Sequence, residues 1–421
     1  MKITAVKTGK TYKGSKGKDV IEFTARAGNQ ITVNALGGND TITVKGGSKH
    51  TINTGSGADT VYLRKGSSHK VITGAGTNKI YVKAGSSHTI TGGSGVDKLY
   101  VSAGSVKKAS LGNGNDIVSV TGGTLKSVNL GSGRNKITVT GGTVSSIMGG
   151  SGIDTIEVSA QKKITIKAGD GDNVITVNGI DNKKFSGVSR GTIISGSGVD
   201  TITVNKGGYY KVDAGSGKDV IKVNGGSNII VGGSGQDKIE VNSKYANAVD
   251  AGPGNDRITL RGKSYNSAIV GGNGNDTIVV KNTNPTGYFN YLEGGAGNDT
   301  YHVYSLGHNL FINNGTGMST DTDVLHFHGS SNDIRTLYYD SSQDTLFINE
   351  NVWVAKVSSF SKIIVDSYGY SASEVKAVAT YVDSGINVGE YINDYSSNLS
   401  KFIYEEGITN ELARRIGYSG K

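Results

Sequence analysis

The feature that most constrains this chain is a short repeat that runs through most of its length. An aspartate or asparagine follows a glycine-rich stretch of the form Gly-x-Gly-x, and most steps between these positions are 19 residues. Self-similarity at a fixed short period is typical of solenoid proteins, in which each repeat forms one coil. The recurring positions are Asp19, Asp40, Asp59, Asn78, Asp97, Asp116, Asn135, Asp154, Asn173, Asp200, Asp219, Asp237, Asp256, Asp276 and Asp299.

Each repeat contains two turns and two short strands. In GGNGNDTIVV at residues 271–280, a glycine turn ends at the aspartate, and polar and apolar residues then alternate. Alternation of period two indicates a half-buried strand, so Ile278 and Val280 are expected to point inward and Thr277 and Val279 outward. The other half, such as RKGSSHKVI at 64–72, has a second turn without the acidic ending.

The repeat predicts the fold class. A coil this small cannot bury its apolar face alone, whereas stacked coils share a continuous thin core. We therefore predict an all-β fold, a right-handed parallel β-roll or β-solenoid of 19-residue coils over residues 1–303. The composition agrees, because 65 glycines can supply turns with positive φ, while 2 prolines and no cysteine exclude collagen and disulfide scaffolds.

The turns that end in aspartate have the composition of a calcium site. Glycines let the backbone curl so that carbonyl oxygens point into a shared space, and the aspartate adds a carboxylate. Calcium takes about six to eight hard oxygen ligands, more than one turn supplies, so we expect the ion between consecutive coils.

The predicted ligands follow from this arrangement. The carboxylates are those of Asp19, Asp40, Asp59, Asp97, Asp116, Asp154, Asp200, Asp219, Asp237, Asp256, Asp276 and Asp299. The turn glycines of the last six are Gly196, Gly198, Gly215, Gly217, Gly233, Gly235, Gly252, Gly254, Gly272, Gly274, Gly295 and Gly297. Asn78, Asn135 and Asn173 lack the charge and are predicted to be weaker sites.

These iterated GGxGxD-like units resemble the RTX (repeats-in-toxin) haemolysin-type calcium-binding family over roughly residues 14–303. The resemblance implies calcium as the bound ion, export through a type I secretion system, and folding outside the cell. Three features depart from the family pattern. Only one edge of each coil carries the motif, so one file of ions is expected; asparagine replaces aspartate in three coils; and the repeats are basic.

The charge is unevenly distributed along the chain. Residues 1–290 hold 36 basic and 19 acidic residues, and residues 291–421 hold 8 and 16. The scattered lysines favour a solvated surface, and the alternative is a surface that binds acidic polysaccharide. No nucleic-acid partner is expected. No apolar run approaches the ~20 residues of a membrane span, so no transmembrane segment is expected. No apolar segment typical of a signal peptide is present either. The resemblance to the RTX family, whose export signal is C-terminal, implies an extracellular or cell-surface location.

The composition changes after the repeats. Residues 304–370 are predicted to form a degenerate last repeat, with Asp321 and Asp323 as weaker calcium ligands, followed by an antiparallel β-cap like that of haemolysin-type proteins. Residues 371–421 have helical periodicity and are predicted to carry a C-terminal type I secretion signal. At the other end, the first coil is expected either to dock onto another copy or partner, or to be covered by residues 1–13.

Three ladders of side chains invite functional interpretations. His50, His69 and His88 are 19 residues apart, and we expect an exposed ladder continued by Lys107 and Lys126, with transition-metal binding as the less favoured alternative. Tyr62, Tyr81 and Tyr100 should stack outward, most simply as a stabilising ladder. Thr pairs such as Thr41 and Thr43 suggest an ice-binding face, but Lys79, Lys98, Lys136 and Glu157 interrupt it.

No constellation of catalytic residues is convincing. GVSRG at 187–191 matches a nucleophile pattern, but it lies in an insertion and not between a strand and a helix, so Ser189 is not expected to be catalytic. We therefore expect a non-enzymatic, secreted, calcium-binding structural or adhesive protein, such as a surface-layer or filament subunit that assembles as a homopolymer or on a cell surface. The alternatives are a polysaccharide-binding module and the C-terminal part of a larger RTX enzyme or toxin.

Overall fold

The computed structural model describes residues 1–159, 161–179, 190–206, 208–263, 266–282, 289–304, 309–313, 321–328, 337–340, 345–348, 352–355, 360–365 and 368–370. Within these residues the chain is an all-β parallel solenoid, as predicted, and contains no helix. No helix in this part of the chain could therefore span a membrane. The predicted helices of residues 371–421 and the predicted non-catalytic Ser189 lie outside the described residues. The chain divides into two compact units, Met1–Thr201 and Ile202–Lys421.

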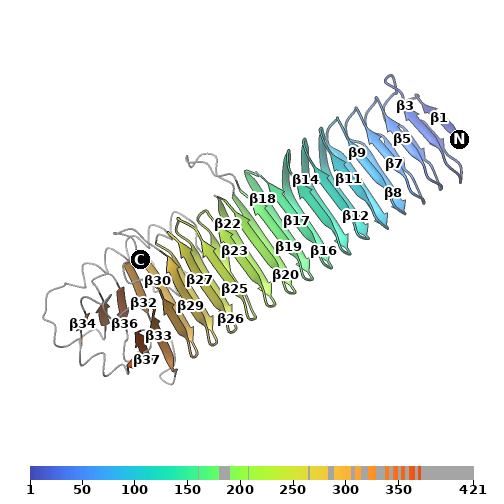
Figure 1. Cartoon of the computed structure of the whole chain (residues 1–421). Helices are drawn as coiled ribbons and strands as arrows, with labels where there is room; N and C mark the ends of the chain where they lie inside the picture. Colours follow the sequence, from blue (N-terminus) through green and yellow to red (C-terminus); the bar gives the residue numbers. More distant parts are fainter. Residues whose placement is uncertain are drawn as a thin grey trace, which may run out of the picture. The chain divides into compact units, whose positions relative to one another are not determined.

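The first unit contains two parallel sheets, and successive coils add one strand to each (Figure 1). One sheet consists of β1 (Lys2–Ala5), β3 (Val20–Phe23), β5 (Thr41–Val44), β7 (Thr60–Leu63), β9 (Lys79–Val82), β11 (Lys98–Val101), β13 (Ile117–Val120), β15 (Lys136–Val139), β17 (Thr155–Ser159) and β19 (Val174–Asn178). The other consists of β2 (Thr11–Lys13), β4 (Thr32–Asn34), β6 (Thr51–Asn53), β8 (Lys70–Ala75), β10 (His88–Ser94), β12 (Ser105–Asn113), β14 (Thr124–Ser132), β16 (Thr143–Ser151), β18 (Lys163–Asp170) and β20 (Arg190–Ser197).

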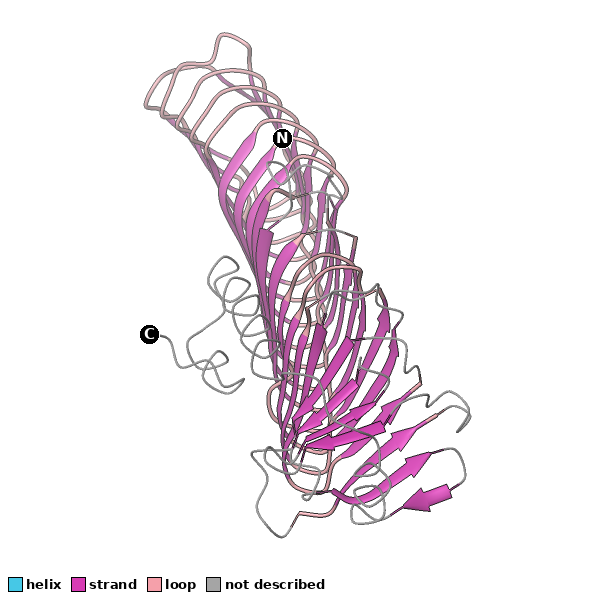
Figure 2. Cartoon of the chain, turned by 90° about the vertical axis from the view of Figure 1, so that its left-hand side faces the viewer, coloured by secondary structure: helices cyan, strands magenta, loops and turns pink. Residues whose placement is uncertain are grey.

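The second unit repeats this plan. One sheet includes β21 (Thr201–Asn205), β23 (Val220–Asn224), β25 (Lys238–Asn242), β27 (Arg257–Gly262), β29 (Thr277–Asn282), β31 (Thr300–Val303), β33 (Asp323–Phe327), β37 (Phe360–Val365) and β38 (Tyr368–Tyr370). The other includes β22 (Tyr209–Ser216), β24 (Ile229–Val231), β26 (Ala248–Pro253), β28 (Ala268–Asn273), β30 (Phe289–Ala296), β32 (Asn309–Asn313), β36 (Val352–Ala355), β35 (Thr345–Ile348) and β34 (Leu337–Asp340). Figure 2 shows the strands in magenta and the connecting turns in pink.

Identical register in successive coils builds the core. Ile42 pairs with Val61 and Val44 with Leu63, and all four side chains are fully buried. The branched side chains stack in files along the inner face of each sheet, because the strand alternation repeats without a shift. Val279 lies on the outer face, as the alternation predicts, in register with Thr259 and His302, but it is only 1% exposed.

The described residues at both ends of the solenoid continue the pairing of its strands. Residues 1–13 do not fold over the first coil as a cap, since β1 and β2 pair in parallel with β3 and β4 and form a coil of their own. Parallel pairing continues after residue 303, with β33 and β37 added to β31. The strands β34, β35 and β36 pair antiparallel, as do β37 and β38, in agreement with the strands predicted around residues 334–366.

Candidate metal centre

A file of buried carboxylate and carboxamide side chains follows one edge of the coils in each unit. All fifteen predicted aspartates and asparagines are at most 2% exposed, and Asp323 continues the file in the second unit at 2%. Each stands at the end of a glycine turn, directly before a strand, so the turn aims its side chain into the stack. Buried charged groups of this kind need a partner, because transfer out of water disfavours the ionised form.

One oxygen of each side chain links neighbouring coils. The Asp40 amide donates to Asp59 Oδ1 at 2.8 Å in the first unit, and the Asp256 amide donates to Asp276 Oδ1 at 2.7 Å in the second. The Asp299 amide donates to Asp323 Oδ1 at 2.6 Å, so Asp323 occupies the position expected of a last ligand. Asp321 contacts the glycine turn that precedes Asp299, because its Oδ2 accepts a hydrogen bond from the Gly297 amide at 3.2 Å.

Among the described residues, eight of these aspartates have a second carboxylate oxygen that is buried without a hydrogen-bond partner. They are Asp40, Asp59, Asp116, Asp154, Asp237, Asp256, Asp276 and Asp299, in each case through Oδ2. Burial raises the pKa of Asp40 to about 6, that of Asp276 to about 7 and that of Asp299 to about 8. An ionised carboxylate with an unpaired buried oxygen requires a nearby cation, or else it takes up a proton.

The coils that carry asparagine show which groups lie near the atom that corresponds to Oδ2 of aspartate. Asn173 accepts the Asp154 amide through Oδ1, as the aspartates do, and its Nδ2 donates to the carbonyls of Gly171 at 2.7 Å and Gly169 at 3.2 Å. Asn78 Nδ2 also approaches the Gly76 carbonyl, at 3.4 Å, but its shorter hydrogen bond is to Asp97 Oδ1 at 2.8 Å. In an aspartate coil the corresponding atom is an oxygen with no hydrogen to donate, so a cation is needed between it and the turn carbonyls.

Not every asparagine is satisfied in this way. Asn135 Nδ2 has no hydrogen-bond partner in the described part of the chain. The acidic residues beside Asn173 are directed elsewhere, because Asp170 Oδ1 accepts Ser197 Oγ and Asp172 Oδ1 accepts the Val199 amide on the exposed side of the turn. The asparagine coils therefore remain predicted weaker sites.

The turn glycines are required by backbone geometry. The twelve predicted ones, from Gly196 to Gly297, all have φ between +97° and +151°, a region that L side chains rarely adopt. A Cβ on Gly254 would collide with the Gly235 carbonyl oxygen of the preceding coil. A Cβ on Gly271 would collide with Asp276 Oδ2 and would lie 2.5 Å from the Gly294 carbonyl oxygen, so the glycine leaves open a space lined by oxygens.

These donors fit calcium. They are all hard oxygens, from carboxylates and backbone carbonyls of two adjacent coils, which is the ligand set that calcium selects. The ion would supply positive charge to the unpaired Oδ2 atoms and would hold neighbouring turns together. The individual assignments made from the sequence remain predictions, and the structure brings their side chains and glycines together at one edge.

The second edge is closed by neutral side chains, and here the sequence expectation was wrong. His50, His69 and His88 are fully buried and not an exposed ladder. Their rings stack with centroids 4.7 Å and 5.0 Å apart, and Phe23 lies 4.6 Å beyond His50. In each ring, Nε2 is hydrogen-bonded to the backbone carbonyl of the residue four positions earlier. Nδ1 of His50 and Nδ1 of His69 each accept a hydrogen bond from a backbone amide of the preceding coil.

The cause of the error is a step of 18 residues. His88 pairs with Val106, and Val106 with Leu125, so Lys107 and Lys126 lie one position outside the histidine file and are exposed. Burial lowers the pKa of His69 to about 4, so the stack is neutral. Both ring nitrogens of His50 and of His69 are occupied by backbone groups, so these two rings offer no nitrogen to a transition metal.

Sequence reasoning also missed the rest of this second edge. Gln161 Oε1 accepts the Val144 amide at 2.8 Å, and in the second unit Asn247 Oδ1 accepts the Asn228 amide at 3.0 Å. These neutral side chains accept a backbone amide of the preceding coil, as Oδ1 of the aspartates does at the first edge. The residues carry no glycine-aspartate signature, and only their spacing of about one coil could have revealed them.

The outward faces match the remaining expectations. Tyr62, Tyr81 and Tyr100 are half-buried and stack with centroids 5.0 Å and 4.9 Å apart. The threonine columns are interrupted in register, since Thr60 pairs with Lys79 and Lys79 with Lys98.

Comparison with known proteins identifies the repeats. The family model for the RTX calcium-binding nonapeptide repeat matches four copies, over residues 212–241, 250–281 and 286–303. These segments are RTX calcium-binding repeats. They contain the carboxylates from Asp219 to Asp299 and their turn glycines from Gly215 to Gly297. The protein is thus a β-solenoid with RTX calcium-binding repeats.

The chain was also compared with curated protein sequences and with solved structures. Comparison with curated protein sequences gives no significant match. Among solved structures, the chain is similar to a hyperactive, Ca²⁺-dependent, β-helical antifreeze protein from an Antarctic bacterium, with 17% identity, a TM-score of 0.44, and coverage of 92% of this chain and 96% of that one.

Exchange of aspartate and asparagine should separate calcium binding from folding. Asp276→Asn places an amide where Oδ2 faces the turn, so we expect the calcium-free protein to gain about 1–3 kcal/mol of stability and the protein to lose about one bound calcium. Asn173→Asp should do the reverse. Denaturant unfolding with and without calcium, together with calcium titration, measures both effects. If Asp276→Asn leaves calcium stoichiometry and affinity unchanged, its carboxylate is not a ligand.

The raised carboxyl pKa values predict opposite pH dependences for the two forms. Folded pKa values of about 6 to 8 lie above the ordinary aspartate value of 3.8, so the contribution of these carboxylates to the stability of the calcium-free fold is greatest below pH ~4 and is lost as the pH rises toward 8. Calcium binds the ionised form, so its affinity should rise over the same interval, with proton release. Calorimetric titration in buffers of different ionisation enthalpy tests this, and an affinity that is constant from pH ~5.5 to 8.5 contradicts it.

Proposed function

We propose that this protein is a secreted, non-enzymatic structural or adhesive protein of a cell surface or extracellular matrix, and that calcium drives its folding. The observation that carries the proposal is the file of buried carboxylates, eight of which have a second oxygen without a hydrogen-bond partner within the described residues of the two units. A surface-layer or filament subunit is the form of such a protein that the charge distribution favours.

The carboxylate file makes folding conditional on calcium. Without a cation, the unpaired Oδ2 atoms stay buried without a donor. Neighbouring aspartates also raise one another's pKa, as Asp59 and Asp19 raise the pKa of Asp40 after the larger effect of burial. An ion that binds the folded state and not the unfolded state stabilises it by mass action. A chain of this kind stays unfolded where calcium is scarce, which suits export, and folds where calcium is abundant.

The outer surface supports a structural role. A hollow beside the second turn edge of the first unit is lined by Ser68, Ser87, Thr89, Ser105, Val106, Lys107, Thr124 and Lys126. These are hydroxyl, aliphatic and ammonium groups with no carboxylate or imidazole among them, so this hollow offers no acid–base pair of the kind that hydrolytic or lyase chemistry uses.

Assembly is favoured by the opposed charges of the chain. Residues 1–290 are net basic and residues 291–421 are net acidic, so the acidic part of one copy would attract the basic part of a second copy. Such heterologous contacts produce open chains when they do not close into rings.

A second candidate function is the binding of acidic polysaccharide. Lys107 and Lys126 are exposed at adjacent coils of the hollow, beside serine and threonine hydroxyls that can accept or donate hydrogen bonds to sugars. Retention of the calcium-loaded protein on heparin or alginate above ~0.3 M salt would favour this function. Lys107→Ala with Lys126→Ala should then abolish retention, whereas Lys7→Ala with Lys10→Ala serves as a charge-matched control.

Calcium should convert the full chain from an unfolded to a β-rich state. Circular dichroism and thermal melting, with calcium and after chelation, are expected to show reversible gain of β structure and melting temperature. Electron microscopy of the same samples is expected to show ordered assemblies only with calcium. Unchanged spectra on chelation would remove the calcium-folding proposal, and a strict monomer at high protein concentration with calcium would remove the assembly proposal.

A further inference from the structure

The second unit carries a cluster of three histidines that is separate from the carboxylate file. His302 lies on β31, His326 lies on β33, and His328 follows directly after β33. The strands β31 and β33 pair in parallel with His302 opposite His326, so both side chains leave the same outward face. The amide of His328 donates to the Val303 carbonyl at 2.8 Å, which extends the pairing and brings the third ring to that face.

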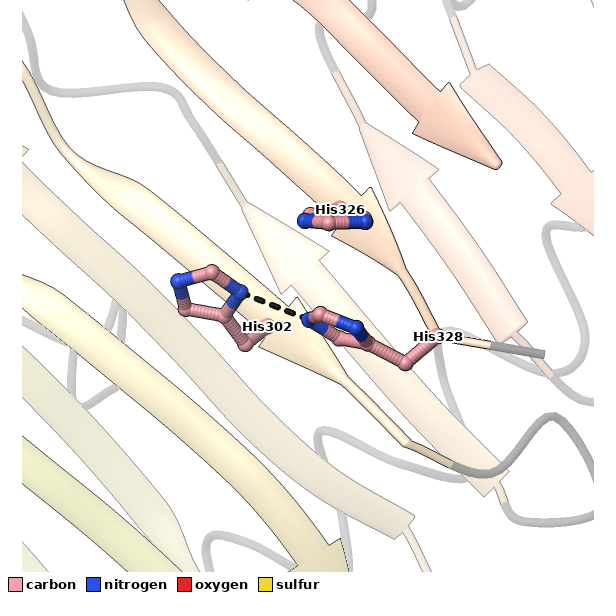
Figure 3. Close-up of side chains that lie close together, drawn as sticks. All are labelled: His302, His326 and His328. Carbon is pink, nitrogen blue, oxygen red and sulfur yellow. Dashed lines mark hydrogen bonds between the residues drawn. The ribbon is translucent and has the colours of Figure 1, made fainter. Parts of the chain in front are cut away.

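The three rings converge. One nitrogen of each lies within 4.8 Å of the others, and His302 Nδ1 is 2.8 Å from His328 Nε2 (Figure 3). The ring centroid of His328 is 3.8 Å from that of His326 and 5.0 Å from that of His302. Such convergence of three imidazoles from two strands is the arrangement that histidine metal sites use.

We propose that His302, His326 and His328 bind a first-row transition-metal ion, with zinc(II) as the expected occupant. Imidazole nitrogen selects borderline ions such as zinc, nickel and copper, whereas calcium prefers oxygen. The site is therefore chemically distinct from the calcium file. Zinc–nitrogen bonds are about 2.0–2.1 Å long, so the nitrogens of His302 and His328 need to separate by only about half an ångström to admit the ion.

The surroundings support neutral, oriented ligands. Tyr304 stacks on His328 with centroids 4.1 Å apart and planes 7° apart, and Lys281 Nζ lies 4.2 Å from the Tyr304 ring centre. Burial lowers the pKa of His302, and His328, His326, Arg257 and Lys281 lower it further. Neutral imidazole is the form that binds a metal. Three protein ligands leave a fourth position for water or for a group from another molecule.

The position of the site suggests what the ion does. It joins β31, the last strand within the matched repeats, to β33, which in turn pairs with β37. An ion held by both strands would clamp two successive coils on their outer face, in addition to the hydrogen bonds between them. The inference does not depend on calcium ligation by the aspartates.

The test uses tag-free, calcium-saturated full-length protein, titrated with zinc and, separately, with cobalt(II). We expect one additional metal per chain, a higher melting temperature with zinc, and the visible absorption of four-coordinate cobalt with nitrogen ligands. His326→Gln and His302→Gln should each weaken zinc binding at least about 100-fold, since even outer-shell changes cost about 10–100-fold. Tyr304→Phe is the matched control and should retain binding.

The outcomes are distinguishable from failure of folding or of the calcium proposal. All variants should keep the wild-type circular dichroism spectrum in calcium, because the substituted side chains lie on the outer face. Zinc binding that persists in the triple variant His302→Gln, His326→Gln, His328→Gln would overturn the assignment, as would failure of the folded wild-type protein to bind zinc below ~100 µM.

Discussion

The structure depends on a contact that proteins normally avoid, which is oxygen facing oxygen in a buried turn. In eight coils the aspartate that ends the glycine turn accepts an amide of the preceding coil through Oδ1, and its Oδ2 is buried without a hydrogen-bond partner within the described residues. Asp97 differs, because its Oδ2 accepts the Gly93 amide at 3.1 Å. The Asn173 amide shows the neutral solution, because its two Nδ2 contacts satisfy Gly169 and Gly171. An aspartate at the same position has an unpaired negative oxygen that a hard cation can neutralise, and for this reason we propose that the fold responds to calcium.

The two edges of the solenoid therefore differ in their chemistry while sharing one geometry. At each edge an inward side chain accepts an amide from the preceding coil. At the first edge the acceptor is a carboxylate, which is stable only with a cation or a proton. At the second edge the acceptors are imidazoles, carboxamides and hydroxyls, such as His69, Asn228 and Ser267, which are satisfied without an ion. The proposed calcium ions would therefore act only at the carboxylate edge, while the hydrogen bonds at the other edge hold the coils in register without calcium.

Much of this was predictable because the period is visible in the sequence. The aspartate file, its glycines and the parallel stacking follow from the 19-residue step and from the need of glycine at positive φ. The burial of His50, His69 and His88 was equally within reach, since alternation from Val71 back to His69 places the ring inside. It was missed because counting 19 residues from His88 leads to Lys107, whereas the coil shortens to 18 and leads to Val106.

Other features could not be predicted in this way. His302 and His326 are 24 residues apart, because an insertion lengthens that coil, and only the strand register places them side by side. The burial of Val279 depends on which side chains pack over the outer face of its sheet, and the alternation of polar and apolar residues does not show this.

Anomalous diffraction at a wavelength that enhances the calcium signal, from crystals of the calcium-loaded protein, tests the central claim most directly. The account predicts a single file of calcium peaks along the first turn edge, each beside Oδ2 of an aspartate such as Asp256 or Asp276 and beside carbonyls of two adjacent turns, with weaker or missing peaks at Asn78, Asn135 and Asn173. Peaks on the second edge, or strong peaks at the asparagine turns with none at the aspartates, would contradict it.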